Sequence, residues 1–283
     1  MEERGENKMK KKVIALLCCM ILVLAVFTGC GESSSDVKVT AKIVGIDLTS
    51  EEYAFGVDKS QPELLKSINE FINEIKSNGT FDEICNHYFG NGTPVAVTSA
   101  TLDSSKEQLV VATNADFKPF EYQEGDNYYG IDMEIASMLA QYLGKELVIL
   151  HMDFDAICKA VANKEADIAM AGEQYVDFSN SYYTASQRLI VLSDNTEFDF
   201  CMDVADVEEI LSIKTPQARV GVQAGTTGQD YCEGDESLGF KGFDVSVFGY
   251  KKGSLALEGL LKGELDYVII DAEPAQYMIE ELK

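Results

Sequence analysis

The sequence predicts an α/β protein with two domains. Its length of 283 residues is close to twice the roughly 150 residues of an average domain. Hydrophobic residues make up 46% of the chain, which supports a sizeable core and excludes a disordered or collagen-like chain. Short apolar strand patterns alternate with helical patterns. This alternation is typical of parallel sheets that helices cover on both faces.

The charge balance excludes several classes of function. There are 23 Lys and Arg against 48 Asp and Glu, a formal net charge of −25. This excess of acid argues against nucleic-acid binding, because phosphate contacts need clustered Lys and Arg. With two His and no C-x-x-C pair, the sequence predicts no metal site and no cofactor. Disulfides and free thiols both fit the four cysteines beyond residue 30, which are Cys85, Cys158, Cys201 and Cys232.

Residues 1–29 predict a lipoprotein signal peptide. Four Lys between residues 8 and 12 precede an apolar run at 13–27, which is shorter than the about 20 residues of a membrane-spanning helix. Residues 27–30 read FTGC and resemble a bacterial lipobox, in which Cys30 is acylated. A polar linker at 30–40 follows. The alternative is a signal anchor with an incidental Cys.

The first folded elements are expected between residues 41 and 90. Two short β-type runs lie at 43–46 and 53–57. A helix is expected from Pro62, in its first turn, to Gly79, because apolar residues recur there at helical spacing. A second, short helix follows at 80–88. Residues rich in Gly, Ser, Thr and Ala then predict a linker at 91–107.

Beyond this linker the strand and helix patterns alternate. The expected strands are residues 109–113, 146–150, 166–170, 187–192, 219–223, 245–248 and 265–270. The expected helices are residues 131–143, 154–163, 204–211, a segment that starts near 226, 255–261 and 274–282. Residues 114–123 are expected to form a loop.

Four stretches, in this order, resemble the polar amino-acid type (family 3) of the extracellular solute-binding proteins of bacterial ABC importers. They are LVVATNADFKPFEY at 109–122, YGIDMEIA at 129–136, the segments FDAI, ADIAMAG and VDFSNSYY within 154–183, and GVQAGTTG at 221–228 with DYVIID at 266–271. The resemblance implies a two-lobed periplasmic-binding-protein-like fold of type II. Two crossing strands would form its hinge, and a ligand would bind between the lobes.

The order of these segments indicates a circular permutation. Residues 79–90 read GTFDEICNHYFG, which resembles the family's C-terminal ending but precedes the family's beginning. The resemblance then implies lobe 1 at 54–188, with 91–107 as the permutation linker, and lobe 2 at 36–53 and 189–283. The crossings are expected near 53–57 and 186–192. A tail fragment fused to a truncated second copy, or swapped chains, are the alternatives.

The resemblance also implies a ligand site. Asp271, after an apolar strand, matches the position that takes the ligand's ammonium; a helix-capping Asp is the alternative. Thr226 and Thr227 stand at a strand-to-helix turn, where N–H groups and hydroxyls attract a carboxylate. Ordinary capping by Thr is the alternative there.

Three further residues match positions around the ligand's side chain. Phe117 and Phe154 match the aromatic residues that cover it, although core packing explains them equally well. Asn114 would bind polar atoms of the side chain, or else make a turn.

The segment after Ala171 and Gly172 departs from the family. The family continues with a T-x-T-x-x-R segment whose Arg holds the ligand's carboxylate, but about seven residues, the Arg among them, are missing here. Arg188, on an expected crossing strand, either reaches the cleft or faces solvent. Glu173 places an acid near the expected carboxylate position, and together with Asp271 it suits a cationic ligand.

These residues predict a monomeric, lipid-anchored, extracellular receptor that delivers a small polar ligand, an amino acid, to an ABC importer permease. The membrane contact would be made through lipid alone, and no catalytic residue is expected. A cation or polyamine binder, a ligand-free interaction module and, last, a dehydratase-like enzyme with Glu173 as general acid or base are the alternatives.

Overall fold

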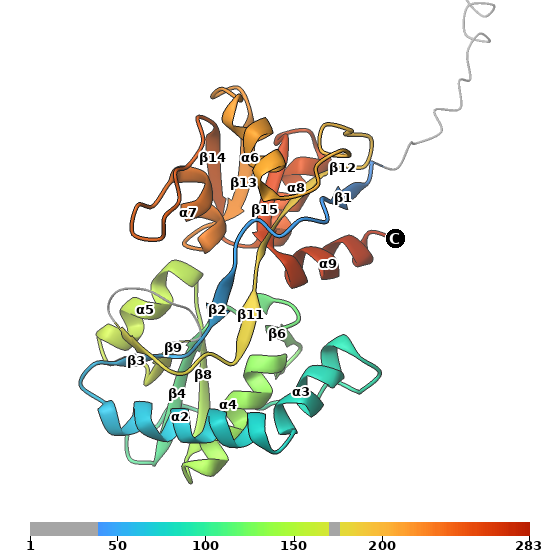
Figure 1. Ribbon diagram of the computed structural model, residues 1–283. Helices are drawn as coiled ribbons and strands as arrows, with labels where there is room; N and C mark the ends of the chain where they lie inside the picture. The colour runs from blue at the N-terminus through green and yellow to red at the C-terminus, as the bar shows by residue number, and fades with distance from the viewer. Residues whose placement is uncertain (1–38, 170–175) are drawn as a thin grey trace, which may run out of the picture. The chain divides into compact units, whose positions relative to one another are not determined.

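A computed structural model describes residues 39–169 and 176–283 (Figure 1). The predicted signal peptide, the lipidation site Cys30, and three predicted ligand-binding residues, Ala171, Gly172 and Glu173, lie outside the described residues. Two five-stranded sheets with their helices form the two lobes, which are named here lobe 1 and lobe 2.

The sheet of lobe 1 has the strand order β10-β3-β9-β4-β8. Its strands are β10 (Val176–Phe178), β3 (Gly56–Asp58), β9 (Ile168–Ala169), β4 (Gln108–Thr113) and β8 (Glu146–His151). β10, β9, β4 and β8 run in one direction, while β3 is antiparallel to both of its neighbours. The expected parallel sheet is present, with β3 as its one reversed strand among the described residues.

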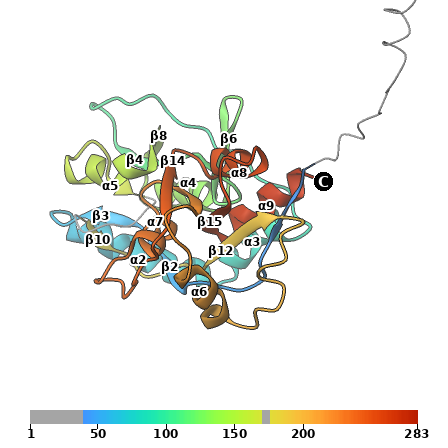
Figure 2. The same cartoon turned by 90° about the horizontal axis from the view of Figure 1, so that it is seen from above.

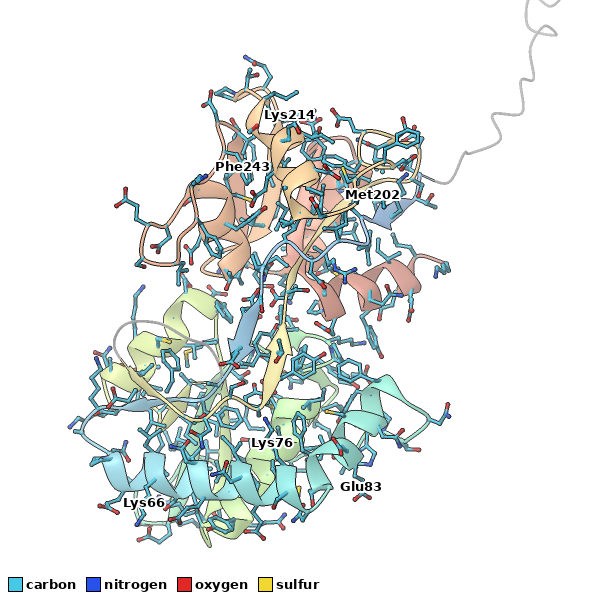
Figure 3. The ribbon with its side chains drawn as sticks, in the orientation of Figure 1. Lys66, Lys76, Glu83, Met202, Lys214 and Phe243 are labelled. Atoms are coloured by element: carbon cyan, nitrogen blue, oxygen red, sulfur yellow. The ribbon has the colours of Figure 1, made fainter. Side chains whose placement is uncertain are left out.

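Helices cover both faces of this sheet, and the alternation of side chains along β4 explains the two layers. Leu109 and Val111 pack with α2 (Pro62–Ser77), α3 (Thr80–Phe89) and α4 (Ile131–Tyr142). Ala112 packs on the other face with α5 (Phe154–Ala162). Pro62 lies in the first turn of α2 as expected, although Gln61, with no side-chain capping bond, is the N-cap. Gly79 adopts φ 85° between α2 and α3. The exposed side chains of Lys66, Lys76 and Glu83 mark the outer surface of these two helices (Figure 3).

The sheet of lobe 2 has the strand order β1-β12-β15-β13-β14. Its strands are β1 (Ala41–Ile43), β12 (Gln187–Leu192), β15 (Tyr267–Asp271), β13 (Arg219–Gln223) and β14 (Ser246–Tyr250). The strands β15, β13 and β14 run parallel, and β12 is antiparallel to β1 and β15.

Two helical layers also cover this sheet. Leu189, Val222 and Ile269 face α6 (Val204–Ser212) and α7 (Thr227–Glu233). Ile190 and Val268 face α8 (Gly253–Leu261) and α9 (Ala272–Glu281). Figure 2 shows α8 and α6 on opposite sides of β15. The central strands β12, β15 and β13 are thus buried on both faces, as their apolar sequences require.

A two-stranded antiparallel ladder runs between the sheets. It consists of β2 (Glu51–Tyr53) and β11 (Tyr183–Ala185), and it pairs Tyr53 with Tyr183. The second crossing strand was expected near residues 186–192. It lies just before them, at β11. Gln187 already pairs with Asp271 inside the sheet of lobe 2.

The expected loop at 114–123 contains the beginning of a small sheet. Its strands are β5 (Asp116–Phe117), β6 (Glu121–Glu124) and β7 (Asn127–Tyr129). These strands are too short to give a period-2 signal in the sequence.

Residues 91–107 lie along the edge of lobe 1. The N–H of Ala100 donates to the carbonyl of Leu147 at 2.8 Å, and the N–H of Ile149 donates to Ser99 Oγ at 2.8 Å. The buried carboxylate of Glu134 holds the beginning of the segment, because it accepts from the N–H of Val95 at 3.2 Å. The segment thereby covers the outer edge of β8.

Candidate functional site

The polar residues of the candidate site stand where parallel strands end. Asn114 follows β4, Gln223 ends β13 and Asp271 ends β15. All three are buried, with at most 4% of each exposed. In α/β sheets, the carboxyl ends of the strands are where ligands bind.

Asp271 does not serve its own helix. It occupies the N-cap position of α9, but its side chain makes no capping hydrogen bond. The carboxylate instead accepts a hydrogen bond from the hydroxyl of Tyr53 on the crossing strand β2. The helix-capping alternative is therefore wrong, and this buried carboxylate needs another explanation.

The surroundings of Asp271 raise its pKa. Burial raises the pKa of the carboxyl to about 7, and the negative charge of Glu51 adds to the effect. Hydrogen bonds from Tyr53 and Gln187 lower the pKa in part. The fully buried Gln187 also donates to Glu51 Oε1 at 3.0 Å, so one amide holds both carboxylates in place.

A second tyrosine–carboxylate pair lies beside the first. The hydroxyl of Tyr183 donates to Glu273 Oε1 at 2.8 Å, and the rings of Tyr183 and Tyr53 lie 5.8 Å apart. Glu273 Oε2 is buried without a hydrogen-bond partner. Burial and the charges of Asp271, Glu51 and Glu273 hold the pKa of Tyr53 well above its usual range, so this phenol remains a donor.

A third acidic group lies in lobe 1. Glu121 and Asp132 are each 3% exposed, and each carboxyl group acts on the pKa of the other. Burial raises the pKa of Asp132 to about 7, and burial together with the charge of Asp132 raises the pKa of Glu121 well above its usual range. The hydroxyl of Tyr182 donates to Asp132 Oδ2 at 2.9 Å. The charge of Asp271 also acts on Glu121, which indicates that the acidic groups lie near one another.

These acids have no basic partner in the described part of the chain. Glu51, Glu121, Asp132, Asp271 and Glu273 make no ion pair there with Lys, Arg or His. Basic residues elsewhere are paired with other acids: Arg188 with Asp47 at 2.7 Å, Arg219 with Asp266 at 2.9 Å, Lys251 with Asp153 at 2.6 Å and Lys252 with Asp116 at 2.8 Å. Arg188 therefore does not supply the missing carboxylate-binding Arg.

Asn114 and Thr226 are linked through Gln223. Asn114 donates to the carbonyl of Met152 at 2.9 Å and accepts from Gln223 Nε2 at 3.4 Å. The carbonyl of Gln223 accepts from Thr226 Oγ1 at 2.9 Å. Thr226 is the N-cap of α7, as the capping alternative predicts, but its side chain makes no capping bond. Thr227 is the first residue of that helix.

The two aromatic candidates lie in different surroundings. Phe117 is 8% exposed and contacts Phe120 with ring centroids 6.1 Å apart, as a core residue does. Phe154 is partly exposed and lies next to Gly225, where an added Cβ would be 3.5 Å from Phe154 Cδ1. Phe154 is therefore the aromatic residue that adjoins the β13–α7 turn.

Sequence reasoning missed Glu51, Tyr53, Gln187, Glu121 and Glu273. Their shared signal is a polar or acidic side chain in or beside a strand. That signal does not show which distant acids and tyrosines come together.

A cavity of about 720 Å³ lies elsewhere, at the start of β13 and β15. Its lining includes Lys214 (Figure 3), Arg219 and Asp266. Glu197 and Asp266 neutralise the two bases, so the cavity offers no unpaired positive charge to a ligand. Among residues 39–169 and 176–283, no group of ligating side chains fits a metal ion. No helix in these ranges is long and apolar enough to cross a membrane.

The two sheets with a connecting ladder, and polar groups at the strand ends, define a two-lobed periplasmic-binding-protein-like protein. Residues 109–273 match the family model of bacterial extracellular solute-binding proteins, family 3, and the chain belongs to this family. Membership fits an extracellular or periplasmic location.

Curated relatives support the assignment. The arginine-binding extracellular protein ArtP of Bacillus subtilis is 36% identical over 110 residues, covering 36% of this chain and 43% of the relative. Cyclohexadienyl dehydratase of Pseudomonas aeruginosa is 28% identical, covering 59% of this chain and 60% of the relative. The chain thus spans less than two thirds of the length of these relatives.

Solved structures show the same fold. An ancestral amino acid-binding protein, described as a precursor of cyclohexadienyl dehydratase, has a TM-score of 0.51 at 26% identity, covering 71% of this chain and 78% of its own. The substrate-binding protein of an amino acid ABC transporter has a TM-score of 0.50 at 27% identity, with coverages of 62% and 74%.

The carboxyl pair of Glu121 and Asp132 predicts that the protein loses stability as the pH rises. Unfolding lets both groups ionise near pH 4, whereas the folded pair holds its proton to about pH 7, so stability falls across this window by about 2–4 kcal/mol. Glu121→Gln should reduce this dependence of stability on pH, because the amide that replaces the carboxyl group does not titrate. Urea unfolding at pH 5 and pH 8 measures both effects.

Glu124→Gln is the matched control, since Glu124 lies on the same strand but is exposed. A wild type with equal stability at pH 5 and pH 8, or a Glu121→Gln variant with the wild-type slope, contradicts the prediction.

Proposed function

We propose that this chain is a lipid-anchored extracellular receptor that captures an amino acid and delivers it to the permease of an ABC importer. The observation that carries the proposal is Asp271, a buried carboxylate at a strand end without a basic partner. Family membership and the arginine-binding relative support it.

The chemistry at Asp271 favours a ligand with an ammonium group. A buried carboxylate without a cation is costly, and here that cost appears as a pKa raised to about 7. An ammonium group would bring the missing charge and three N–H donors. In this proposal Asn114, Phe117, Phe154, Thr226 and Thr227 surround the remainder of the amino acid, together with Ala171, Gly172 and Glu173.

We propose a binding role without catalysis and a monomeric state. A dehydratase needs a general acid or base at its substrate. Both histidines are engaged elsewhere: His87 contacts Glu134 at 2.9 Å, and His151 accepts from the N–H of Ala115 at 2.9 Å.

Asp271→Asn should weaken amino-acid binding by about thirtyfold or more, because breaking a buried charge pair costs about 2–5 kcal/mol. The twenty L-amino acids, putrescine and spermidine are first screened by thermal shift. Calorimetry then compares the wild type with the variant for the compound that gives the largest shift.

Asp266→Asn is the control, because Asp266 precedes the same strand and pairs with Arg219. It should leave the affinity unchanged. A wild type that melts cooperatively but responds to no amino acid contradicts the proposal, and a response to polyamines alone favours the polyamine alternative.

The lipid anchor gives a second prediction. A chain with a net charge of −25 is repelled by anionic membrane surfaces, so lipid at Cys30 would have to supply the attachment. Cys30→Ser should move the protein from the membrane fraction to the soluble fraction of a bacterial host. Cys85→Ser, which removes a thiol within the fold, should leave the protein in the membrane fraction; a membrane-bound Cys30→Ser variant argues against lipidation.

We further propose that the chain is a circular permutant. The strand β3 lies between β9 and β10, although it precedes both in the chain by more than a hundred residues. The last helix of the chain, α9, packs against the first strand, β1. Ala41, Ile279 and Leu282 share one hydrophobic core. Residue 39 can therefore follow residue 283 through a short connection.

A rearranged chain tests the permutation. It runs from 107 to 283, then through a short Gly-Ser linker, and then from 39 to 102. We expect a monomer with the melting temperature and affinity of the original order. An obligate dimer with exchanged elements would favour the swapped-chain alternative.

A further inference from the structure

Tyr53 connects the crossing ladder to the end of a strand of lobe 2. It lies on β2, paired with Tyr183 of β11, and its hydroxyl donates to Asp271 Oδ2. Asp271 is held by β15, which pairs with β12 and β13. One hydrogen bond thus joins the crossing strand to the carboxylate that the proposed function assigns to the ligand.

The hydroxyl is an incomplete partner for this carboxylate. A phenol donates one hydrogen bond and brings no positive charge, whereas an ammonium brings a charge and three donors. The two donors would use the same buried carboxylate, so an arriving ammonium gains the most where the phenol leaves.

The hydroxyl has an alternative acceptor. Glu273 Oε2 is buried and lacks a hydrogen-bond partner, while Oε1 of the same carboxylate is taken by Tyr183. The charge of Glu273 already acts on Tyr53, and the two tyrosine rings lie 5.8 Å apart. A buried acceptor without a donor is costly, and the displaced hydroxyl would remove that cost.

We infer that the Tyr53 hydroxyl occupies the ammonium position on Asp271 in the ligand-free protein, and that ligand binding transfers it to Glu273. The inference rests on the proposed function and adds a specificity element to it. A ligand must displace an internal donor, so neutral ligands bind poorly, and β2 shifts when an ammonium binds. Tyr53 is thus an internal competitor that couples binding to the crossing ladder.

Tyr53→Phe tests the competition, because it keeps the ring and its edge contact with Phe120 at 4.9 Å but removes the hydroxyl. The probe is L-arginine, followed by any amino acid that raises the wild-type melting temperature more. The variant should bind the probe about threefold more tightly, since the hydrogen bond that the wild type gives up at Asp271 is only partly replaced by the one to Glu273. Its melting temperature should fall without the probe and approach that of the wild type at saturation.

Tyr183→Phe is the matched control. Tyr183 faces Tyr53 across the ladder but donates to Glu273, so its loss should not increase the affinity. Carbon-13 NMR of ring-labelled tyrosine gives a second measurement: the wild-type Tyr53 signal should shift when L-arginine binds, and in Asp271→Asn it should not.

The outcomes separate the two proposals. A Tyr53→Phe variant that binds as the wild type does, or more weakly, overturns the inference while the receptor function stands. An unshifted Tyr53 signal in a wild type that binds the probe overturns it as well. A wild type that binds no amino acid overturns the proposed function and the inference together.

Discussion

The carboxylate of Asp271 is buried without a cation, and the polar architecture around the crossing ladder is arranged to tolerate it. Desolvation alone would neutralise the group. The hydroxyl of Tyr53 and the amide of Gln187 restore part of the lost hydration, but Glu51, held by the same amide, adds a second negative charge. The buried charge destabilises this region of the fold, and a cationic group would remove that destabilisation. Local strain of this kind is common at binding sites.

This arrangement depends on strand register. Gln187 is paired with Asp271 in the β12–β15 ladder, and Tyr53 is paired with Tyr183 in the crossing ladder. A shift of one residue in either ladder would turn each of these polar side chains to the opposite face. The apolar residues that fix the register, such as Ile190 and Ile269, are therefore as important for the site as the polar residues themselves.

The sequence predicted the residues whose signal is local. The strand at 109–113 and the end of the strand at Asp271 were recognisable because apolar runs end there in polar residues. Tyr53 and Glu51 were not recognised as site residues, because their partners lie more than a hundred positions away in the chain. The second crossing was placed too late for a similar reason: β12 has the strong apolar pattern, whereas β11 has only three residues.

The segment at 91–107 covers the edge of β8 through backbone hydrogen bonds, although its composition resembles that of a loose linker. These hydrogen bonds also protect the segment from proteases. Proteases cleave extended chain that fits their own active site, so they act on this connection only after it detaches from the sheet. The connection is then as resistant to cleavage as the sheet edge to which it is bound.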